Sequence, residues 1–316
     1  MSSIKHLAFQ VEDDLTELCP FLYKNPREKL ALLVATAIET GSCNTMELAG
    51  RLPLETERSE SRYAWVERLL STKTIDDSAV MAPLAEQIIG FVSSSDDTMV
   101  LCIDQTSIGD SHGIAMLSLR VGSRGVPLFW YVEATKGPIP TKAYLALLEK
   151  VVLLIPSDTK VILAADRFFD ASMLITKCRE YGWGWRIRLR SDRVAGHEDS
   201  ELKLSEMPGL ALKALVKARL GKAETNIGYL HEKGHDEAWY IAMDAIPTKT
   251  TILDYGLRWS CEAMFSDLKT RGFRLEDTQL QRTDRISRLI LVLSIAMHWA
   301  VINGWNQQKK LKKQVQ

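Results

Sequence analysis

Apolar and polar positions follow two different patterns along the chain, and the change comes near residue 95. Before it, apolar residues recur at helical spacing and predict helices over Lys29–Glu39, from Thr45 onward and over Ser61–Ser71. The polar stretch 93–97, Ser-Ser-Ser-Asp-Asp, cannot pack in a core and marks a boundary. We therefore predict an all-helical N-terminal domain over residues 1–95 and a second domain over residues 96–316.

From residue 98 the pattern is that of short apolar strands separated by helices. The predicted strands are Thr98–Asp104, Gly113–Val121, Val126–Ala134, Lys160–Asp166 and Trp183–Leu189, and the predicted helices are Lys142–Leu154 and Ala171–Tyr181. Three strands, a helix, a strand, a helix and a strand in this order indicate an α/β fold with a mixed sheet. A partly stranded stretch follows over 192–245, and then helices over 252–270 and 284–305.

The longest apolar run, Leu289 to Ile302, covers fourteen residues and contains His298. A bilayer requires about twenty apolar residues, so we expect a buried core helix and no membrane partner. The N-terminus lacks the basic start and apolar centre of a signal peptide. The five cysteines are widely spaced without a CxxC pair, as is typical of reduced thiols. Together these features predict a cytoplasmic protein.

Charge is distributed unevenly along the chain. The totals are 40 basic and 40 acidic side chains, but residues 1–100 hold 9 basic against 16 acidic, and residues 101–316 hold 31 against 24. Residues 255–316 alone hold 11 against 5, a balance that suits contact with DNA phosphates. The helix order of the first part fits a small DNA-binding bundle. An ordinary helical bundle is the alternative, because the acidic excess of this part disfavours phosphate contact.

Two acidic residues end predicted buried strands. Asp104 closes the run Met-Val-Leu-Cys-Ile-Asp, and Asp166 closes Lys-Val-Ile-Leu-Ala-Ala-Asp. An acid at the end of an apolar strand lies at a rigid edge of the sheet, where ligands and catalytic groups commonly lie. The alternative for each is an ordinary helix cap or loop acid, and we expect Asp170 to be such a cap.

Four functional side chains share one face of the predicted helix 252–270. Tyr255, Arg258, Glu262 and Lys269 stand at offsets 0, 3, 7 and 14. At about 100° per residue they fall within a stripe roughly 60° wide. A plain amphipathic helix with Arg–Glu ion pairs at i,i+4 is the alternative.

This spacing, Y-x2-R-x3-E-x6-K, resembles the signature of the insertion-sequence DDE transposases of the IS-four family. Asp104 in Cys-Ile-Asp-Gln-Thr and Asp166 in Ala-Asp-Arg-Phe-Phe-Asp resemble the first two acids of that family's triad, and Glu262 resembles the third. The resemblance covers residues 98–305. It implies a ribonuclease H-like mixed sheet flanked by helices, with a β-rich insertion over about 192–245 before the last catalytic helix.

The resemblance implies that Asp104, Asp166 and Glu262 are both the catalytic residues and the metal ligands. Three converging carboxylates repel one another unless cations neutralise them. Hard oxygen ligands suit Mg²⁺, with Mn²⁺ as a substitute, and two ions per active site can activate the attacking oxygen and stabilise the leaving one. The implied reaction is cleavage of transposon ends followed by joining of the 3′-hydroxyl to target DNA.

The resemblance also implies DNA-binding residues. Tyr255, Arg258 and Lys269 are expected to hold DNA phosphates near the cut, and Trp259 to stack on DNA. Trp239 is the tryptophan of the insertion and hence the candidate for accepting a flipped base. Its surroundings, Glu-Ala-Trp-Tyr-Ile-Ala-Met, are equally typical of a buried strand, which favours core packing for this residue.

Three arginines alternate along a predicted strand and therefore share one face: Arg186, Arg188 and Arg190. We expect this face to contact DNA, and a merely solvated face is the alternative. The sequence His231-Glu-Lys-Gly-His235 spells a zinc-protease motif, but Gly234 interrupts it and strand-like segments flank it. A hairpin turn is therefore favoured over a zinc site.

The predicted partners are double-stranded DNA, as terminal inverted repeats and as target, and a second copy of the chain. Two DNA ends require at least a homodimer in the synaptic complex, and the expected location is the nucleoid of a bacterial cell. Two alternatives share the fold: a catalytically silent, domesticated derivative that only binds DNA, and a ribonuclease H-like nuclease without strand transfer.

Overall fold

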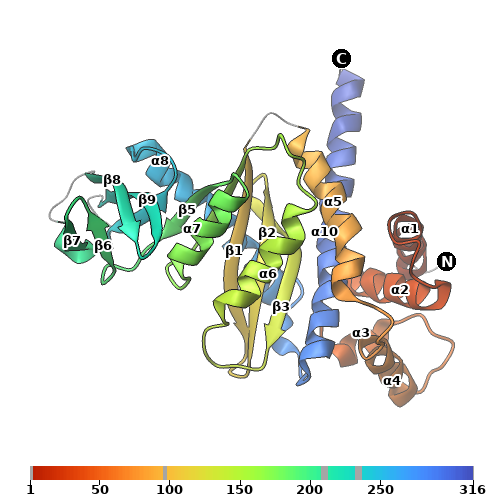
Figure 1. Cartoon of the computed structure of the whole chain (residues 1–316). Coiled ribbons are helices and arrows are strands. Elements are labelled where there is room, and N and C mark those ends of the chain that lie inside the picture. Colours follow the sequence, from red (N-terminus) through yellow and green to blue (C-terminus); the bar gives the residue numbers. More distant parts are fainter. Residues whose placement is uncertain (1–2, 95–97, 208–212, 232–236, 316) are drawn as a thin grey trace.

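The structure is a computed structural model, and it describes residues 3–94, 98–207, 213–231 and 237–315. These residues form one ten-stranded mixed sheet with helices packed against it (Figure 1). Its strand order is β3-β2-β1-β4-β5-β10-β9-β8-β6-β7. The strands are β1 (Met99–Ile108), β2 (His112–Val121), β3 (Arg124–Glu133), β4 (Val161–Ala165), β5 (Gly184–Arg188), β6 (Val194–His197), β7 (Ser200–Lys203), β8 (Lys213–Leu220), β9 (Ala223–Leu230) and β10 (Trp239–Met243).

The centre of the sheet is parallel and its two sides are antiparallel. Strands β1, β4 and β5 run in the same direction, with Ile103 paired to Ala165 and Ala165 paired to Ile187. Strands β2 and β3 form an antiparallel meander beside β1. The mixed α/β architecture with a sheet flanked by helices is therefore confirmed, and it is consistent with a ribonuclease H-like fold.

Strand β1 is longer than predicted. We expected it to end at Asp104, but it continues to Ile108 because its second half pairs with β2 in an antiparallel hairpin, from Asp104 opposite Met116 to Ile108 opposite His112. Only the parallel pairing with β4 stops at Ile103. Asp104 therefore lies in the middle of a strand, at the point where β4 ends and one side of β1 becomes free.

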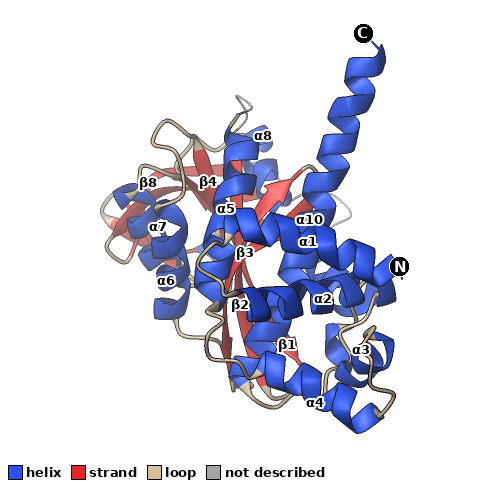
Figure 2. Ribbon diagram, turned by 90° about the vertical axis from the view of Figure 1, so that its right-hand side faces the viewer, coloured by secondary structure: helices blue, strands red, loops and turns tan. Residues whose placement is uncertain are grey.

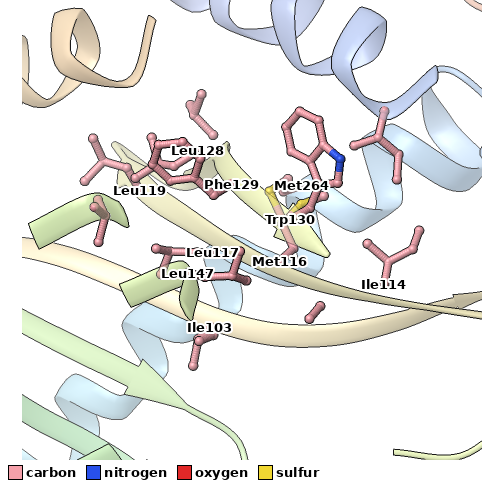
Figure 3. Packing of buried hydrophobic residues seen from close by; sticks show 14 of the residues in the cluster. Ile103, Ile114, Met116, Leu117, Leu119, Leu128, Phe129, Trp130, Leu147 and Met264 are labelled. Carbon is pink, nitrogen blue, oxygen red and sulfur yellow. The ribbon is translucent and has the colours of Figure 1, made fainter. Parts of the chain in front are cut away.

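Helices cover both faces of the central strands. Helix α6 (Thr141–Val152) packs against β2 and β3, and α7 (Ala171–Glu180) packs against β5. Helix α9 (Ser260–Ser266) packs against β1 and β3. The interior between them is apolar; Figure 3 shows Ile103, Leu117 and Leu147 in this packing, together with Trp130 and Met264. The carboxyl side chain of Asp170 accepts hydrogen bonds from the backbone of Ser172 and Met173 and caps α7, as predicted.

The N-terminal helices are α1 (Ser3–Leu18), α2 (Lys24–Thr40), α3 (Thr45–Arg51), α4 (Ser59–Leu70) and α5 (Asp77–Ser93). Helices α2, α4 and α5 pack against helix α10 (Thr283–Val315), while α1 packs against α2 and α3 against α2 and α4 (Figure 2). Arg285 of α10 pairs with Glu67 at 2.6 Å, and Arg288 donates to the carbonyl of Leu70 at 2.8 Å. The largest hydrophobic cluster is continuous across residue 95. The division into domains at residue 95 stays a prediction, and it cuts through a shared core.

Helix α10 contains the longest apolar run of the sequence. Its segment Thr283–Gln307 is long and apolar enough to cross a membrane by length and composition, and the core helix of a soluble protein meets the same criterion. More than half of its most apolar window, 56%, is buried inside the protein. Leu289 to Leu293 are fully covered, so the expected core helix is confirmed. All five cysteines belong to the described residues and are buried free thiols.

The insertion over 192–245 is β-rich, as expected, and it continues the sheet. Strand β10 pairs antiparallel with β5, and β9, β8, β6 and β7 follow outward. A backbone hydrogen bond from Leu189 to the carbonyl of Tyr240, 2.7 Å long, ties the two segments just past the paired strands. The motif His231–His235 lies largely outside the described residues.

Candidate active site

The helical segment that carries the Tyr-Arg-Glu-Lys signature changes its winding three times. It begins as α8 (Lys249–Leu253), tightens to a 3-10 helix η2 (Asp254–Trp259), continues as α9 and widens into a π-helix η3 (Asp267–Arg271). The prediction of one regular α-helix with a single stripe is wrong in this respect. In a 3-10 helix residues i and i+3 eclipse each other, so Tyr255 and Arg258 stand one above the other, with the guanidinium 5.5 Å from the ring centre.

Arg258 joins two of the predicted catalytic acids. Its Nη1 donates to Oδ2 of Asp104 and its Nη2 to Oε1 of Glu262, each at 2.6 Å. The alternation of β1 places Asp104 on the same face as Cys102, which packs against Cys261 and Phe265 of α9. Asp104 therefore faces the helix that carries Glu262. The guanidinium and Asp104 are both largely buried, so their hydrogen bond is shielded from water, whereas the side chain of Glu262 is 59% exposed.

Tyr255 reaches the third acid. Its hydroxyl donates to Oδ1 of Asp166 at 3.1 Å, and its ring is fully buried. Asp166 follows directly after β4, next to the position where Asp104 lies in β1. Burial raises the pKa of the Tyr255 hydroxyl well above its usual value, with Arg258 opposing this rise and Asp166 adding to it. The phenol is therefore a stable proton donor.

The three acids lie within electrostatic reach of one another. Burial raises the pKa of Asp104 to about 6; Arg258 and the backbone N–H of Gln105 oppose this rise, and Asp166 and Glu262 add to it. Burial alone would lower the pKa of Arg258, but Tyr255, Asp104, Asp166 and Glu262 together raise it above its ordinary value. A cation is thus strongly favoured between these carboxylates, and here the cation is a guanidinium.

The donor set fits a hard divalent cation by its chemistry. Asp104, Asp166 and Glu262 supply carboxylate oxygens, the ligands that Mg²⁺ and Mn²⁺ prefer. Within the described residues no group of three or more Asp, Glu, His or Cys side chains already has metal-binding geometry. The carboxylates already have other partners. Arg258 donates hydrogen bonds to both Asp104 and Glu262, and Tyr255 donates one to Asp166.

The sequence model of the family described as "Transposase DDE domain" matches residues 117–299. This chain belongs to that family. The match covers more than half of the chain and includes Asp166, Tyr255, Arg258 and Glu262, while Asp104 lies before its first residue. No curated protein sequence matches the chain.

The transposase does not present its three strand arginines as one open stripe. Arg186 is buried, with Nη1 at 2.5 Å from Asp244 and Nη2 at 3.6 Å from Asp254, so its prediction as a DNA-facing residue is wrong. The segment from α8 to η2 covers it, since its Nε donates to the carbonyl of Thr251. Arg188 pairs with Glu237 at 2.8 Å, and only Arg190, paired with Asp192, is well exposed.

Lys269 of the transposase pairs with an acid outside the proposed triad. It lies in the π-helical turn, and its ammonium pairs with Glu276 at 2.9 Å. A π-helix turns by a smaller angle per residue than an α-helix, so the regular spacing of the stripe does not extend to Lys269. The stripe of the sequence analysis therefore holds for Tyr255, Arg258 and Glu262.

Two tryptophans extend the site on the side of the insertion. Trp239 of β10 packs edge-on against Tyr255, with ring centres 5.3 Å apart, and against Trp259 at 5.9 Å. Trp239 is half-buried beside a small apolar cluster, and Trp259 is 55% exposed. Both residues thus lie next to the signature helix, with Trp239 partly in the core and Trp259 open to solvent.

Sequence reasoning missed Gln105 and Glu237. The Gln105 side chain accepts from the Tyr144 hydroxyl at 2.8 Å and from the backbone of Ile139 at 3.1 Å, and so anchors the loop before α6 next to Asp104. Glu237 bridges Arg188 and Arg167 at 2.8 and 2.9 Å. The position of Gln105 directly after Asp104 was a signal for the first residue, whereas no sequence pattern marks the second.

Proposed function

We propose that this transposase cleaves transposon ends and joins the freed 3′-hydroxyl to target DNA, with Asp104, Asp166 and Glu262 as its catalytic triad. The observation that carries the proposal is the convergence of these three acids on Arg258 and Tyr255, from segments up to 158 residues apart in the chain. The narrower assignment to the IS-four family rests on the Tyr-Arg-Glu-Lys spacing and belongs to this proposal.

The proposed reaction is phosphoryl transfer in two steps. Water attacks the phosphorus at the transposon end and breaks its bond to the 3′-oxygen, which leaves as a 3′-hydroxyl after taking up a proton. That hydroxyl then attacks a phosphate of the target strand and displaces the target's own 3′-oxygen. Two Mg²⁺ or Mn²⁺ ions, held by Asp104, Asp166 and Glu262, would lower the pKa of the attacking hydroxyl and neutralise the leaving oxygen.

The signature residues of the chain would bind and orient the DNA. A guanidinium that engages two carboxylates through Nη1 and Nη2 can engage two phosphate oxygens in the same way, so Arg258 would exchange carboxylates for a phosphate when DNA binds. The Tyr255 hydroxyl would donate to the same backbone. Lys269 would bind a phosphate further along, in place of Glu276.

The proposed partners follow from the chemistry. The substrates are double-stranded terminal inverted repeats and target DNA, and a homodimer would hold two ends in one synaptic complex. The exposed ring of Trp259 would stack on DNA. The proposed location is the bacterial cytoplasm, at the nucleoid.

The decisive experiment incubates the protein with a duplex that carries its own terminal inverted repeat, Mg²⁺ and a supercoiled target. We expect cut ends and joined products with the parent protein. Glu262→Gln keeps the side-chain size but removes the charge, so it should lower the rate at least 1,000-fold, or about 4 kcal/mol of transition-state stabilisation. Glu201→Gln, the same change at an exposed glutamate of β7, is the matched control and should remain active.

Two outcomes would overturn parts of the proposal. Cleavage by Glu262→Gln at the parental rate would show that the triad is wrongly assigned. Cut ends without any joined product, in the presence of target DNA, would indicate a nuclease without strand transfer.

A further inference from the structure

A groove of about 910 Å³ adjoins the candidate active site and is not used by the proposed chemistry. Three segments form it: the loop before α6 at 138–141, the loop after β4 at 167–170, and the chain leading into the insertion at 190–194. Its lining combines exposed apolar surface with three arginines. Arg167 follows directly after Asp166, so the groove begins one residue from the proposed triad.

The apolar surface of the groove is centred on Phe168. This ring is 73% exposed, whereas its neighbour Phe169 is 8% exposed and packs edge-on against Tyr144 at 4.7 Å. Phe169 therefore anchors the loop in the core and leaves Phe168 directed outward. A large aromatic ring held open to water in this way presents an unused flat face.

Three arginines and two aspartates, Asp170 and Asp192, line the groove around Phe168, so basic side chains are in excess. The guanidinium of Arg167 lies 5.9 Å from the Phe168 ring centre, and Arg190 and Arg193 line the same groove. Arg190 pairs with Asp192, an exposed pair of the kind that contributes little to stability. Within the described part of the chain, Arg193 is exposed and has no ion-pair partner. The groove can therefore offer at least one guanidinium to an anion without breaking a buried contact.

Both walls of the groove are held in place by hydrogen bonds. On one side Gln105 accepts from the backbone N–H of Ile139 at 3.1 Å and donates to the carbonyl of Gly137 at 3.2 Å. On the other side the backbone N–H of Leu204 donates to the backbone carbonyl of Arg193 at 2.9 Å, and the backbone N–H of Ser205 donates to the backbone carbonyl of Ser191 at 2.8 Å. The groove is thus part of the fold and needs no rearrangement to form.

We propose that this groove binds a single, unpaired strand of DNA that leads away from the cut, with one base stacked on Phe168 and the strand's phosphates on Arg190 and Arg193. Inside a duplex each base is covered on both faces by its neighbours, so only an unpaired or terminal base can stack on a protein ring. An exposed ring between guanidinium groups is the arrangement that binds single strands without reading their sequence. The position of this strand beside the cut rests on the proposed function.

The test compares two DNA molecules that share one duplex sequence, one blunt and one with a single-stranded tail. Binding is measured by fluorescence anisotropy in EDTA, so that no cleavage occurs. We expect the parent protein to prefer the tailed DNA. Phe168→Ala should weaken the affinity for tailed DNA about 5- to 100-fold and leave the affinity for blunt DNA unchanged. Phe168→Trp should retain the preference for tailed DNA.

Two further variants sharpen the test. Phe21→Ala removes another exposed ring, 54% exposed and in the turn between α1 and α2, and should change neither affinity. Arg193→Ala should reduce the slope of log affinity against log salt by about 0.7 for tailed DNA, the value for one phosphate contact on a single strand. Unchanged thermal unfolding of Phe168→Ala would show that the exposed side chain is not needed for folding.

The proposal is overturned if the parent protein binds both DNA molecules equally, or if Phe168→Ala weakens both to the same extent or neither. A tail carrying 5-iodouracil should crosslink to Phe168 on irradiation, and crosslinking only to other segments would also contradict it. These readouts need no catalysis. They therefore separate failure of the groove from failure of the triad, which the Glu262→Gln cleavage assay tests.

Discussion

The two halves of the ten-stranded sheet differ in how they are covered. In the inner half, from β3 to β5, helices lie on both faces, and the first eight residues of β2 are all buried. In the outer half, from β10 to β7, most side chains of β7 and β8 are exposed or half-buried. The strands form one continuous ladder, so the change in covering takes place within a single sheet.

The inner half holds two of the proposed catalytic acids in place, and the outer half supplies exposed surface beside them. Asp104 and Asp166 are placed by strands of the covered half, where close packing holds their backbone. The insertion contributes surface: Trp239 beside the signature helix, Glu237 as a bridge to Arg167, and one wall of the groove around Phe168. Stability should therefore depend far more on the inner half than on the outer half.

The largest expected effect concerns the centre of the inner half. Leu163 of β4 is fully buried in the main core, so Leu163→Ala should lower the free energy of unfolding by about 2–5 kcal/mol. Equilibrium unfolding in urea measures this loss. A loss below about 0.5 kcal/mol would mean that the covered half does not dominate stability.

A second effect lies in the helical layer beside the inner half. Burial lowers the pKa of His298 to about 4, with the hydrogen bond to the Leu84 carbonyl opposing this shift. The unfolded chain then takes up the proton first, near pH 6.5, so the stability contributed by the neutral ring is lost as pH falls from about 6.5 to about 4. The loss should reach about 3 kcal/mol. Unfolding curves at several pH values should show this slope in the parent and not in His298→Gln.

A smaller effect tests the junction of the two halves, where β5 meets β10. Asp244→Ala removes the nearest partner of the buried Arg186, whose second acid, Asp254, is 3.6 Å away. Because Asp244 is itself partly exposed, water offsets part of the effect, and we expect the free energy of unfolding to fall by about 2 kcal/mol. The double variant Arg186→Met with Asp244→Ala should recover part of this loss in urea unfolding. A double variant worse than the sum of both single changes would contradict the assignment of this pair.

The smallest effect is expected in the outer half. Val216 of β8 is partly exposed, so Val216→Thr should change stability by no more than about 0.5 kcal/mol. The urea midpoint of this variant, compared with that of Leu163→Ala, gives the contrast between the halves directly. If Val216→Thr lowered the free energy of unfolding as much as Leu163→Ala, the two halves of the sheet would not differ in their contribution to stability.

Much of the fold could be predicted because apolar spacing reports local structure directly. The central strands and helices α6 and α7 lie within a few residues of their predicted bounds. Helix α5 was missed because Pro83 stands inside it, and proline normally interrupts a helix. The second half of β1 was missed because its pairing with β2 is a contact between strands, which apolar spacing along one strand does not report.

The candidate site was predictable to the same extent. The order of the acids and the signature spacing located Asp104, Asp166, Tyr255, Arg258 and Glu262. The position of Lys269 was not predictable, because the π-helical turn depends on the packing after α9. The burial of Arg186 was not predictable either: alternation along a strand tells which side chains share a face, but not which segment covers that face.

The position of α10 in the core has a consequence for how the protein is made. The ribosome delivers the N-terminal helices first, yet α2, α4 and α5 pack against α10, which follows every other element in the chain. Until α10 emerges, the apolar faces of these helices have no permanent cover. We therefore expect these helices to stay exposed to chaperones during synthesis, and the N-terminal helices and the sheet to reach their native state together.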